Sequence, residues 1–515
     1  SVSWSPDGKW IAYLSDESGE DEIYVRAQDG KSAPRRLTTN GDIWRFAPVW
    51  SPDSKKLAFG DKKQRLRILD IASGALTDVD TGNYNDLAQY TFAPDSRWLA
   101  YTKTNASQNS SVWLYSLTSK TTRQLTSDET SETDPVFDPK GRYLYFLSNR
   151  DYNLTFSAYE FNFLYRDATR IYAATLASDG PALHRPKSDE AEVGAADHGK
   201  DDGNGDKNEP TPPLRIDLDG RVIALNTPAG NYANLSANAE NVFYTAAGTP
   251  EEGTQLRMIG LEADSKPAVV SKVEGNYVLS RDGKKLLLRR GSEFALVDAK
   301  PDAKFDEGKL SLDHMQLRIE PKREWRQMYV DAWRILRDWF YDPGMHGNDW
   351  NAIRAKYEAW VPYIATRADL DYVLQELAGE VNAGHIYVQS GDAAKVERKD
   401  GGLLGAEFET HSSGYVRIAK IFPGENWERR TRSPLTGPGV DVDEGNFILA
   451  IDNVSTRDVE NIYRLLENKG DRVVTLRVND RPQEDGAREV RVATIKNEQE
   501  VRYLDWVRSK RKLVD

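Results

Sequence analysis

His385 is the residue of this chain best placed to do acid–base chemistry. Residues 367–380 have the periodicity of a helix, Asn382-Ala383-Gly384 ends it, and Ile386–Gln389 then reads as a strand. A side chain at such a junction can face a cleft, and histidine is the natural general base near neutral pH. A single histidine is more often a surface or packing residue, so the residues alone leave that second interpretation open.

A glycine-bounded loop is the second candidate site. Gly402, Leu403, Leu404 and Gly405 precede an alternating strand at 406–409. Further strands are predicted at 415–418, 447–451 and 473–478, with a helix at Asp458–Lys469 between the last two. This order resembles a PDZ domain. The resemblance implies that the loop offers backbone N–H groups to a peptide carboxylate while the next strand accepts the peptide as an added strand. An ordinary glycine turn in a small α+β domain is the alternative.

Several other kinds of chemistry lack their motifs. The chain has no cysteine, which removes disulfides, thiolate metal sites and a cysteine nucleophile. Its six histidines are scattered, with no His-Glu-x-x-His pairing, so we expect neither a metal site nor a cofactor. There is no Gly-x-Ser-x-Gly elbow, phosphate loop or dinucleotide fingerprint. An α/β-hydrolase, as in the prolyl oligopeptidases, is therefore a weak third hypothesis.

His385 and the Gly402–Gly405 loop come after a repeated sequence motif that occupies the first three fifths of the chain. Residues 4–13 read Trp-Ser-Pro-Asp-Gly-Lys-Trp-Ile-Ala-Tyr, and variants return at 50–59, 92–101 and 137–146, with weaker copies at 235–244 and 279–288. The repeat prolines, 6, 52, 94 and 139, are 46, 42 and 45 residues apart. A hairpin repeated at this period predicts a β-propeller, whose blades bury their faces against one another. Unrelated hairpins of a sandwich are the alternative.

The size and charge of the chain limit which partners and locations are expected. The chain has 515 residues and a net charge of −12, with no long basic stripe, so we expect no nucleic-acid partner. No stretch approaches the roughly 18 apolar residues of a membrane span. The chain begins with Ser1 inside a repeat, so we expect that it starts within a longer protein. For its location we expect the cytoplasm, with the periplasm as the alternative.

Four regions are predicted from these patterns. The propeller, mainly β, takes residues 1–320 and carries a disordered insertion near 188–213, which is polar and rich in Gly and Pro. A small helical region takes 321–398, with helices at 324–340, 349–359 and 367–380. The PDZ-like region takes 399–495, and a helix over 503–514 belongs to a last region, 496–515.

The order of these regions resembles the tricorn protease family of serine peptidases, relatives of the carboxy-terminal processing proteases. The propeller itself is TolB-like. Besides the repeats, the resemblance is carried by these segments: Trp333-Arg334-Ile335-Leu336-Arg337-Asp338-Trp339-Phe340-Tyr341-Asp342-Pro343-Gly344-Met345-His346-Gly347, Asp349-Trp350, Gly384-His385, Arg432-Ser433-Pro434-Leu435, Gly439-Val440, Gly445 and Ile448-Leu449-Ala450.

The resemblance implies a catalytic domain split around the PDZ domain. Its first half carries the general-base histidine, which corresponds to His385, and its second half carries the nucleophilic serine and a glutamate, which would lie beyond Asp515. Gly384 departs from the archaeal archetype, which has a serine there. We therefore expect a serine endopeptidase for peptides or unfolded chains, with the propeller as a filter, possible ring assembly, and no activity in this chain alone. The alternative is a non-enzymatic propeller–PDZ module that captures protein termini.

Overall fold

The computed structural model describes residues 2–515 except 153, 160, 166, 184–212, 218–220, 250, 392–396 and 458, and it leaves out the side chains of Tyr165 and Arg429. The predicted insertion at 188–213 therefore lies almost wholly outside the described residues. The chain divides into two compact units, Ser1–Ser390 and Gly391–Asp515.

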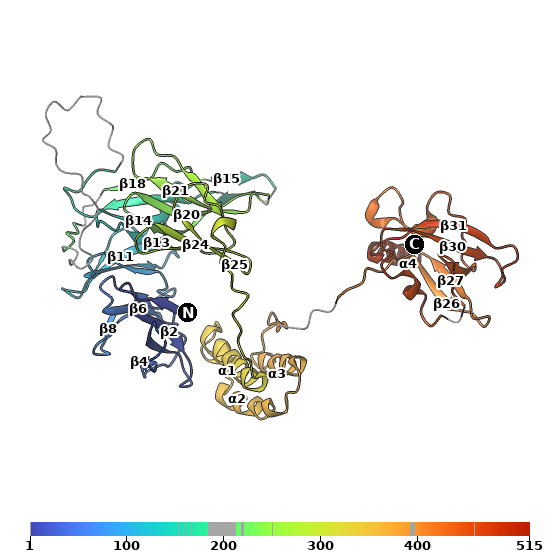
Figure 1. Cartoon of the computed structure of the whole chain (residues 1–515), viewed down its shortest axis with the longest axis horizontal. Coiled ribbons are helices and arrows are strands. Elements are labelled where there is room, and N and C mark those ends of the chain that lie inside the picture. The colour runs from blue at the N-terminus through green and yellow to red at the C-terminus, as the bar shows by residue number, and fades with distance from the viewer. Residues whose placement is uncertain are drawn as a thin grey trace. The chain divides into compact units, whose positions relative to one another are not determined.

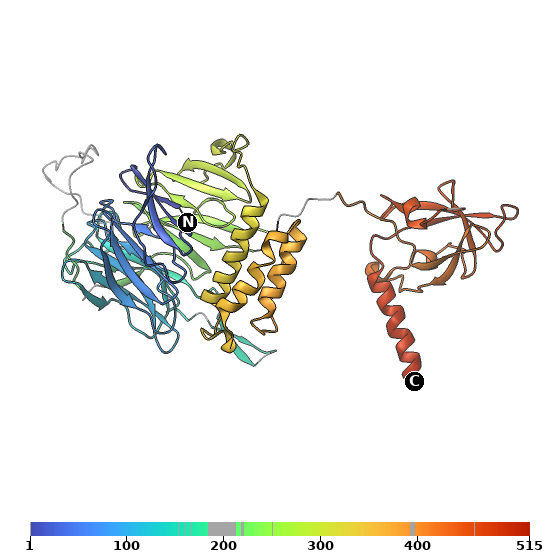
Figure 2. The ribbon, with the colours of Figure 1, turned by 90° about the horizontal axis from the view of Figure 1, so that it is seen from below.

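Six antiparallel sheets follow one another through the first unit and form propeller blades (Figures 1 and 2). Blade 1 contains β1 (Val2–Trp4), β2 (Trp10–Ser15), β3 (Glu22–Ala27) and β4 (Arg35–Arg36). Blade 2 contains β5 (Val49–Trp50), β6 (Lys56–Gly60), β7 (Arg65–Asp70) and β8 (Leu76–Thr81). Blade 3 contains β9 (Tyr90–Phe92), β10 (Trp98–Thr104), β11 (Ser110–Ser116) and β12 (Thr121–Gln124).

The next three blades include both weaker sequence repeats. Blade 4 contains β13 (Glu132–Phe137), β14 (Tyr143–Ser148), β17 (Arg170–Thr175) and β18 (Val222–Ala224), with the hairpin β15 (Leu154–Ser157) and β16 (Asn162–Tyr165) inserted. Blade 5 contains β19 (Tyr232–Ala237), β20 (Asn241–Ala247), β21 (Thr254–Gly260) and β22 (Ala268–Lys272). Blade 6 contains β23 (Val278–Leu279), β24 (Lys285–Arg290) and β25 (Glu293–Asp298). The predicted propeller is confirmed.

The repeated Ser-Pro-Asp turn closes the first hairpin of a blade and also contacts the next blade. In blade 2, the Ser51 hydroxyl donates to Asp53, and Asp53 accepts in turn from the N–H of Lys55 at 3.1 Å. The N–H of Asp53 donates to the Ser96 hydroxyl of blade 3 at 3.0 Å. The motif therefore specifies both a local turn and a blade-to-blade bond.

The apolar core of the propeller lies between the blades. Five separate clusters of buried side chains each join two consecutive sheets, so that the two faces of one sheet serve different clusters. In β6, Leu57 and Phe59 pack toward blade 1 whereas Ala58 packs toward blade 3. This division follows from the two-residue period of a strand. It explains why one blade alone would leave its faces exposed to water.

Three helices complete the first unit. They are α1 (Pro321–Trp339), α2 (Trp350–Glu358) and α3 (Arg367–Gly379), with short 3-10 turns at η1 (Asp306–Gly308), η2 (Met345–Gly347) and η3 (Val361–Tyr363). The first helix starts three residues before the predicted position, because Pro321 suits the first helical turn. The predicted strand Ile386–Gln389 is wrong. No strand of the described residues pairs with it, and an extended segment without a hydrogen-bonded neighbour forms no sheet.

Helix α1 is fastened to the first blade by two arginines. Arg334, whose side chain is 3% exposed, donates to Asp16 at 2.8 Å and to Asp21, both in the loop between β2 and β3. Arg337 donates to both carboxylate oxygens of Glu20, at 2.6 and 2.9 Å. The guanidinium fork matches the carboxylates of this loop, so the bonds set the helix orientation as well as its position.

Aromatic contacts extend the same interface to blade 2. The Trp339 ring meets the edges of Trp44 and Phe46, with ring centres 6.1 and 6.2 Å away, and the Lys62 ammonium lies 4.2 Å from its centre. Asp338, which is buried, accepts a hydrogen bond from the N–H of Trp44 at 2.9 Å. The helix thus has apolar and polar attachments to the propeller.

One carboxyl group of this interface predicts a pH dependence of stability. Burial, together with the neighbouring Asp16 carboxylate, raises the pKa of Asp331 to about 6. Between pH 4 and 6 Asp331 then binds more protons in the folded state than in the unfolded chain, so its contribution lowers the free energy of unfolding as the pH rises. Asp331→Asn should remove this penalty and raise the Tm at pH 7.5 by about 1–2 °C, a small effect because Asp331 is partly exposed.

The measurement is thermal unfolding of both proteins at pH 4.5 and pH 7.5. At pH 4.5 the two Tm values should nearly coincide. An equal Tm difference between the two proteins at both pH values would show that the pKa of the Asp331 carboxyl group is not raised. Asp313→Asn is the matched control, because this exposed residue precedes the helices and should leave both values unchanged.

The second unit contains one antiparallel sheet and one helix of 16 residues. The order of its main strands is β26 (Ala406–Thr410), β27 (Val416–Ile421), β28 (Phe447–Ile451), β30 (Val473–Asn479) and β31 (Arg488–Ala493), with β29 (Val454–Ser455) paired to β28. Short 3-10 turns are η4 (Arg429–Thr431), η5 (Pro434–Thr436) and η6 (Ile462–Leu466), and the unit ends in α4 (Gln499–Val514). A single apolar cluster inside the sheet includes Leu404, Ile448 and Leu476.

The helix predicted at Asp458–Lys469 is wrong. Only the 3-10 turn η6 forms there, and the first residue of the predicted range lies outside the described residues. The backbone bonds with the loop that precedes β26 instead: the N–H of Gly402 donates to Leu466 O at 2.8 Å, and the N–H of Asn468 donates to a carbonyl of the same loop. These distant partners replace the i to i−4 bonds that a helix needs.

Within the described ranges, no helix combines the length with the apolar character that crossing a membrane requires.

Candidate functional site

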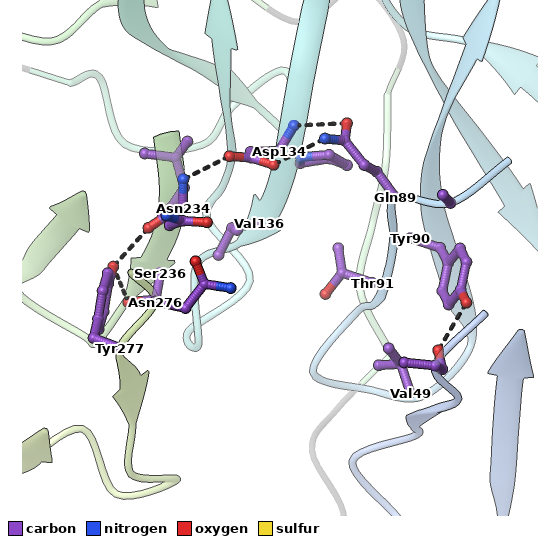
Figure 3. A pocket seen from close by; sticks show the side chains of 14 residues that line it. Val49, Gln89, Tyr90, Thr91, Asp134, Val136, Asn234, Ser236, Asn276 and Tyr277 are labelled. Atoms are coloured by element: carbon purple, nitrogen blue, oxygen red, sulfur yellow. Dashed lines mark hydrogen bonds between the residues drawn. The ribbon is translucent and has the colours of Figure 1, made fainter. Parts of the chain in front are cut away.

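A cavity of about 440 Å³ lies among the first strands of blades 2 to 6 (Figure 3). The first strands of neighbouring blades contact one another, so the cavity belongs to the inner part of the propeller. Amide and hydroxyl side chains such as Gln89, Asn276 and Ser236 reach it, together with Tyr90 and Tyr277. Such groups can bond to the N–H and C=O groups of a peptide backbone regardless of its sequence.

Five lining residues occupy one equivalent position of the repeat. They are Ala47, Gln89, Asp134, Asn234 and Asn276. Three of them lie five residues before the turn proline, Asn276 lies five residues before Arg281, and Asn234 matches Asp134 because both strands shift register at this point. Sequence reasoning missed them, although aligning the repeats on their turns would have shown that this position is polar in four of five copies.

Asp134 is the one charged side chain among the fourteen residues that line the cavity. Its carboxylate accepts from the Gln89 side-chain amide at 3.0 Å and from the N–H of Asn234 at 2.7 Å, as Figure 3 shows. Burial raises the pKa of Asp134, and the bond from Asn234 offsets part of that rise. Asp134 thus joins blades 3, 4 and 5 at the cavity wall.

His385 lies six residues after the end of α3, on an exposed stretch of the helical region. Among the described residues, no hydrogen bond to its ring is found, so both ring nitrogens are available. The other histidine of this region, His346, differs: its Nδ1 bonds to Val381 O at 2.9 Å and its Nε2 to the Tyr341 hydroxyl. His346 therefore fixes the segment that leads to His385, and it cannot act as a base without breaking those bonds.

The backbone before His385 is held at several points. Asn348 donates to Glu380 O at 2.9 Å, and the Glu380 carboxylate accepts from Lys356 at 2.6 Å and from the Tyr357 hydroxyl at 2.7 Å. A side chain on Gly384 would meet nothing within 4 Å, so the serine expected from the resemblance would fit sterically. These contacts position the segment but supply no second catalytic group.

The loop Gly402–Gly405 is described in full, and its N–H groups are largely occupied. Those of Gly402 and Leu403 donate to Leu466 O and Ile495 O, both at 2.8 Å. The N–H of Gly405 donates to the Glu498 carboxylate at 3.1 Å. The loop belongs to the second compact unit and His385 to the first. Its role in peptide binding stays a prediction.

Three family profiles match the chain in succession. The profile described as "Tricorn protease second beta propeller domain" matches residues 1–300, "Tricorn protease C1 domain" matches 321–379, and "Tricorn protease PDZ domain" matches 402–497. The first alone covers more than half of the chain.

The chain belongs to the tricorn protease family.

Individual relatives agree with this assignment. "Tricorn protease homolog 1" of Streptomyces coelicolor is 27% identical over 543 residues, which cover 99% of this chain and 49% of that protein. The tricorn protease of Thermoplasma volcanium is 25% identical over 512 residues, or 97% of this chain and 48% of that protein. The chain therefore spans about half the length of the curated relatives it matches.

The tricorn fold is also found in a solved structure. "Crystal structure of the tricorn protease" superposes with a TM-score of 0.74 at 19% identity, covering 100% of this chain and 49% of that one. At this identity the likeness shows the fold alone. A TolB structure from Acinetobacter baumannii reaches only 0.38, which supports no argument about this chain.

Each candidate site lies in, or directly after, one of the three matched tricorn regions. The cavity lies in the propeller region, His385 follows the end of the C1 match, and the Gly402–Gly405 loop opens the PDZ match. Within the described residues, no three His, Asp or Glu side chains come together as a metal site requires.

Proposed function

We propose that this chain is the substrate-admitting and base-bearing part of a tricorn-type serine endopeptidase that cleaves peptides or unfolded chains. The observation that carries the proposal is the order of the second-propeller, C1 and PDZ matches along the chain. In this assignment His385 acts as the general base. The nucleophilic serine and its glutamate partner belong to the part of the relatives that this chain does not cover.

The structure supports each assignment with one observation. Half of the fourteen residues that line the cavity carry an amide or hydroxyl group, which suits a filter that admits flexible chains of any sequence. His385 is exposed and has no hydrogen bond within the described region, so a serine hydroxyl brought to it would find a free ring nitrogen. The PDZ region has an edge strand, β26, that can receive an extended peptide.

The test compares this chain with a longer protein that continues beyond Asp515. A fluorophosphonate probe, which labels activated serines, should label the longer protein, and that protein should cleave α-casein, which is unfolded. The 515-residue chain should do neither, because a base without a nucleophile cannot form an acyl-enzyme. Labelling of the 515-residue chain would contradict the assignment of its parts. A longer protein that neither reacts nor cleaves would leave a propeller–PDZ binding module instead.

A further inference from the structure

The carboxylate position of the PDZ region is already filled from within the chain. Glu498, which is 8% exposed, precedes α4 and places Oε2 3.1 Å from the N–H of Gly405. Its other oxygen, Oε1, accepts from Arg502 Nε at 2.8 Å and lies 2.6 Å from Nη2 of the same guanidinium. One internal carboxylate thus bonds with a loop N–H and with a nearby cation.

These are the groups that would recognise the terminal carboxylate of a peptide. Recognition of that group requires backbone N–H donors and benefits from a positive charge close by. The N–H groups of Gly402 and Leu403 are bonded to backbone carbonyls, and that of Gly405 is bonded to Glu498. Of the four loop N–H groups, as far as the described residues go, that of Leu404 alone has no such bond, which leaves one backbone donor for a carboxylate that has two oxygens.

A second carboxylate at this loop would meet two obstacles. It would lie within a few Å of the Glu498 carboxylate, and like charges brought together in a partly buried site repel strongly. To take the bonds instead, it would have to displace a side chain that also joins the loop to α4 through Arg502. A peptide with a free C-terminus therefore gains little binding free energy from its terminal carboxylate at this loop.

The edge of the sheet remains able to bind an extended chain. Strand β26 is the outermost strand of the sheet, and in the part of the chain that the structure describes it pairs with β27 alone. Phe408 of this strand packs against Tyr463 of η6, with ring centres 6.1 Å apart, so an apolar surface accompanies the edge. Addition of a strand uses backbone bonds along the edge and requires no chain terminus.

We propose that the PDZ region binds interior segments of extended polypeptides rather than free C-termini, because Glu498 occupies the position of a terminal carboxylate. The inference deepens the proposed function and rests on its peptide-binding part. It names the class of segment that the PDZ region binds.

The test uses overlapping 15-residue segments of α-casein, each made with a free and with an amidated C-terminus. For the 515-residue chain, the two forms of any binding segment should have Kd values within about twofold of each other. In Glu498→Ala the free form should bind at least about tenfold more tightly than the amidated form, since the loop N–H and Arg502 become available. Glu498→Gln, which keeps the size of the side chain and removes its charge, should change the ratio in the same direction.

Glu500→Ala is the matched control, because Glu500 is exposed in the first turn of α4 and should leave the ratio near one. A preference of tenfold or more for free carboxylates in the unmodified chain would overturn the inference while leaving peptide binding intact. So would a ratio that stays near one in both Glu498 variants. Failure of every segment to bind would overturn the peptide-binding part of the proposed function, and this inference with it.

Discussion

Replacing Arg334 with alanine should lower the free energy of unfolding by about 3–5 kcal/mol, the range for breaking a buried ion pair. The Arg334 side chain is 3% exposed and is bonded to Asp16 and Asp21, whose own side chains are 29% and 12% exposed. Its removal leaves these carboxylates in a poorly hydrated interface without their cation. The loss should exceed that of any other single residue of the α1 interface.

Urea unfolding followed by tryptophan fluorescence measures this effect. Arg323→Ala is the matched control: it lies in the same helix, is 83% exposed, pairs only with Glu320 at 3.5 Å, and should change stability by less than about 0.5 kcal/mol. Arg334→Lys should lose less free energy of unfolding than Arg334→Ala but more than Arg323→Ala, because lysine restores the charge without the planar guanidinium fork. An Arg334→Ala protein within about 1 kcal/mol of the unmodified chain would mean that solvent replaces the lost bonds.

Replacing His385 with alanine in a longer, active protein should lower kcat/KM on the order of 10⁴-fold. In the proposed mechanism His385 removes the proton from the nucleophilic serine, and it later protonates the leaving amine. Both events belong to the transition state, so kcat should fall while KM changes little. The reaction of the serine with a fluorophosphonate probe should slow in parallel, because that reaction needs the same base.

His314→Ala provides the matched control, since His314 is exposed and precedes α1. It should retain full activity.

His346→Ala should act through structure instead: loss of its bonds to Val381 and Tyr341 frees the segment before His385, so stability and activity should fall together. If His385→Ala retained more than about a tenth of the original kcat/KM, another residue would be the base.

The propeller could be predicted because each blade is specified by residues that are close together in the sequence. Each copy of the motif holds its own turn residues and its own alternation, so the blades at 235–244 and 279–288 were found although their motifs are weak. The helices at 321–379 followed from periodicity for the same reason. The two errors, at Ile386–Gln389 and Asp458–Lys469, fall where distant partners decide the backbone conformation. One segment lacks a neighbouring strand, and the other bonds with the loop before β26.

The site was only partly accessible to such reasoning. His385 was found because it stands at a helix end after a glycine, which is a local pattern. Glu498 was missed because it is one acidic residue among 81 Asp and Glu, and nothing within its own segment marks it. Its role depends on Gly405, 93 residues earlier in the chain. The polar residues that line the cavity around Asp134 were missed because they are spread over four repeats.

The architecture of this protein can be recognised in its amino-acid pattern: repeated hairpins, an amphipathic helical region and a PDZ-like region that opens with a glycine loop. Turns, strand alternation and helix periodicity depend on neighbours within a few residues, so they can be recognised from the sequence alone. The folded structure was needed to show which acids bond with Arg334, which amides line the cavity, and which carboxylate bonds with the loop. Those pairings join residues up to 318 positions apart, and their energies depend on burial and distance, which exist only after the chain has folded.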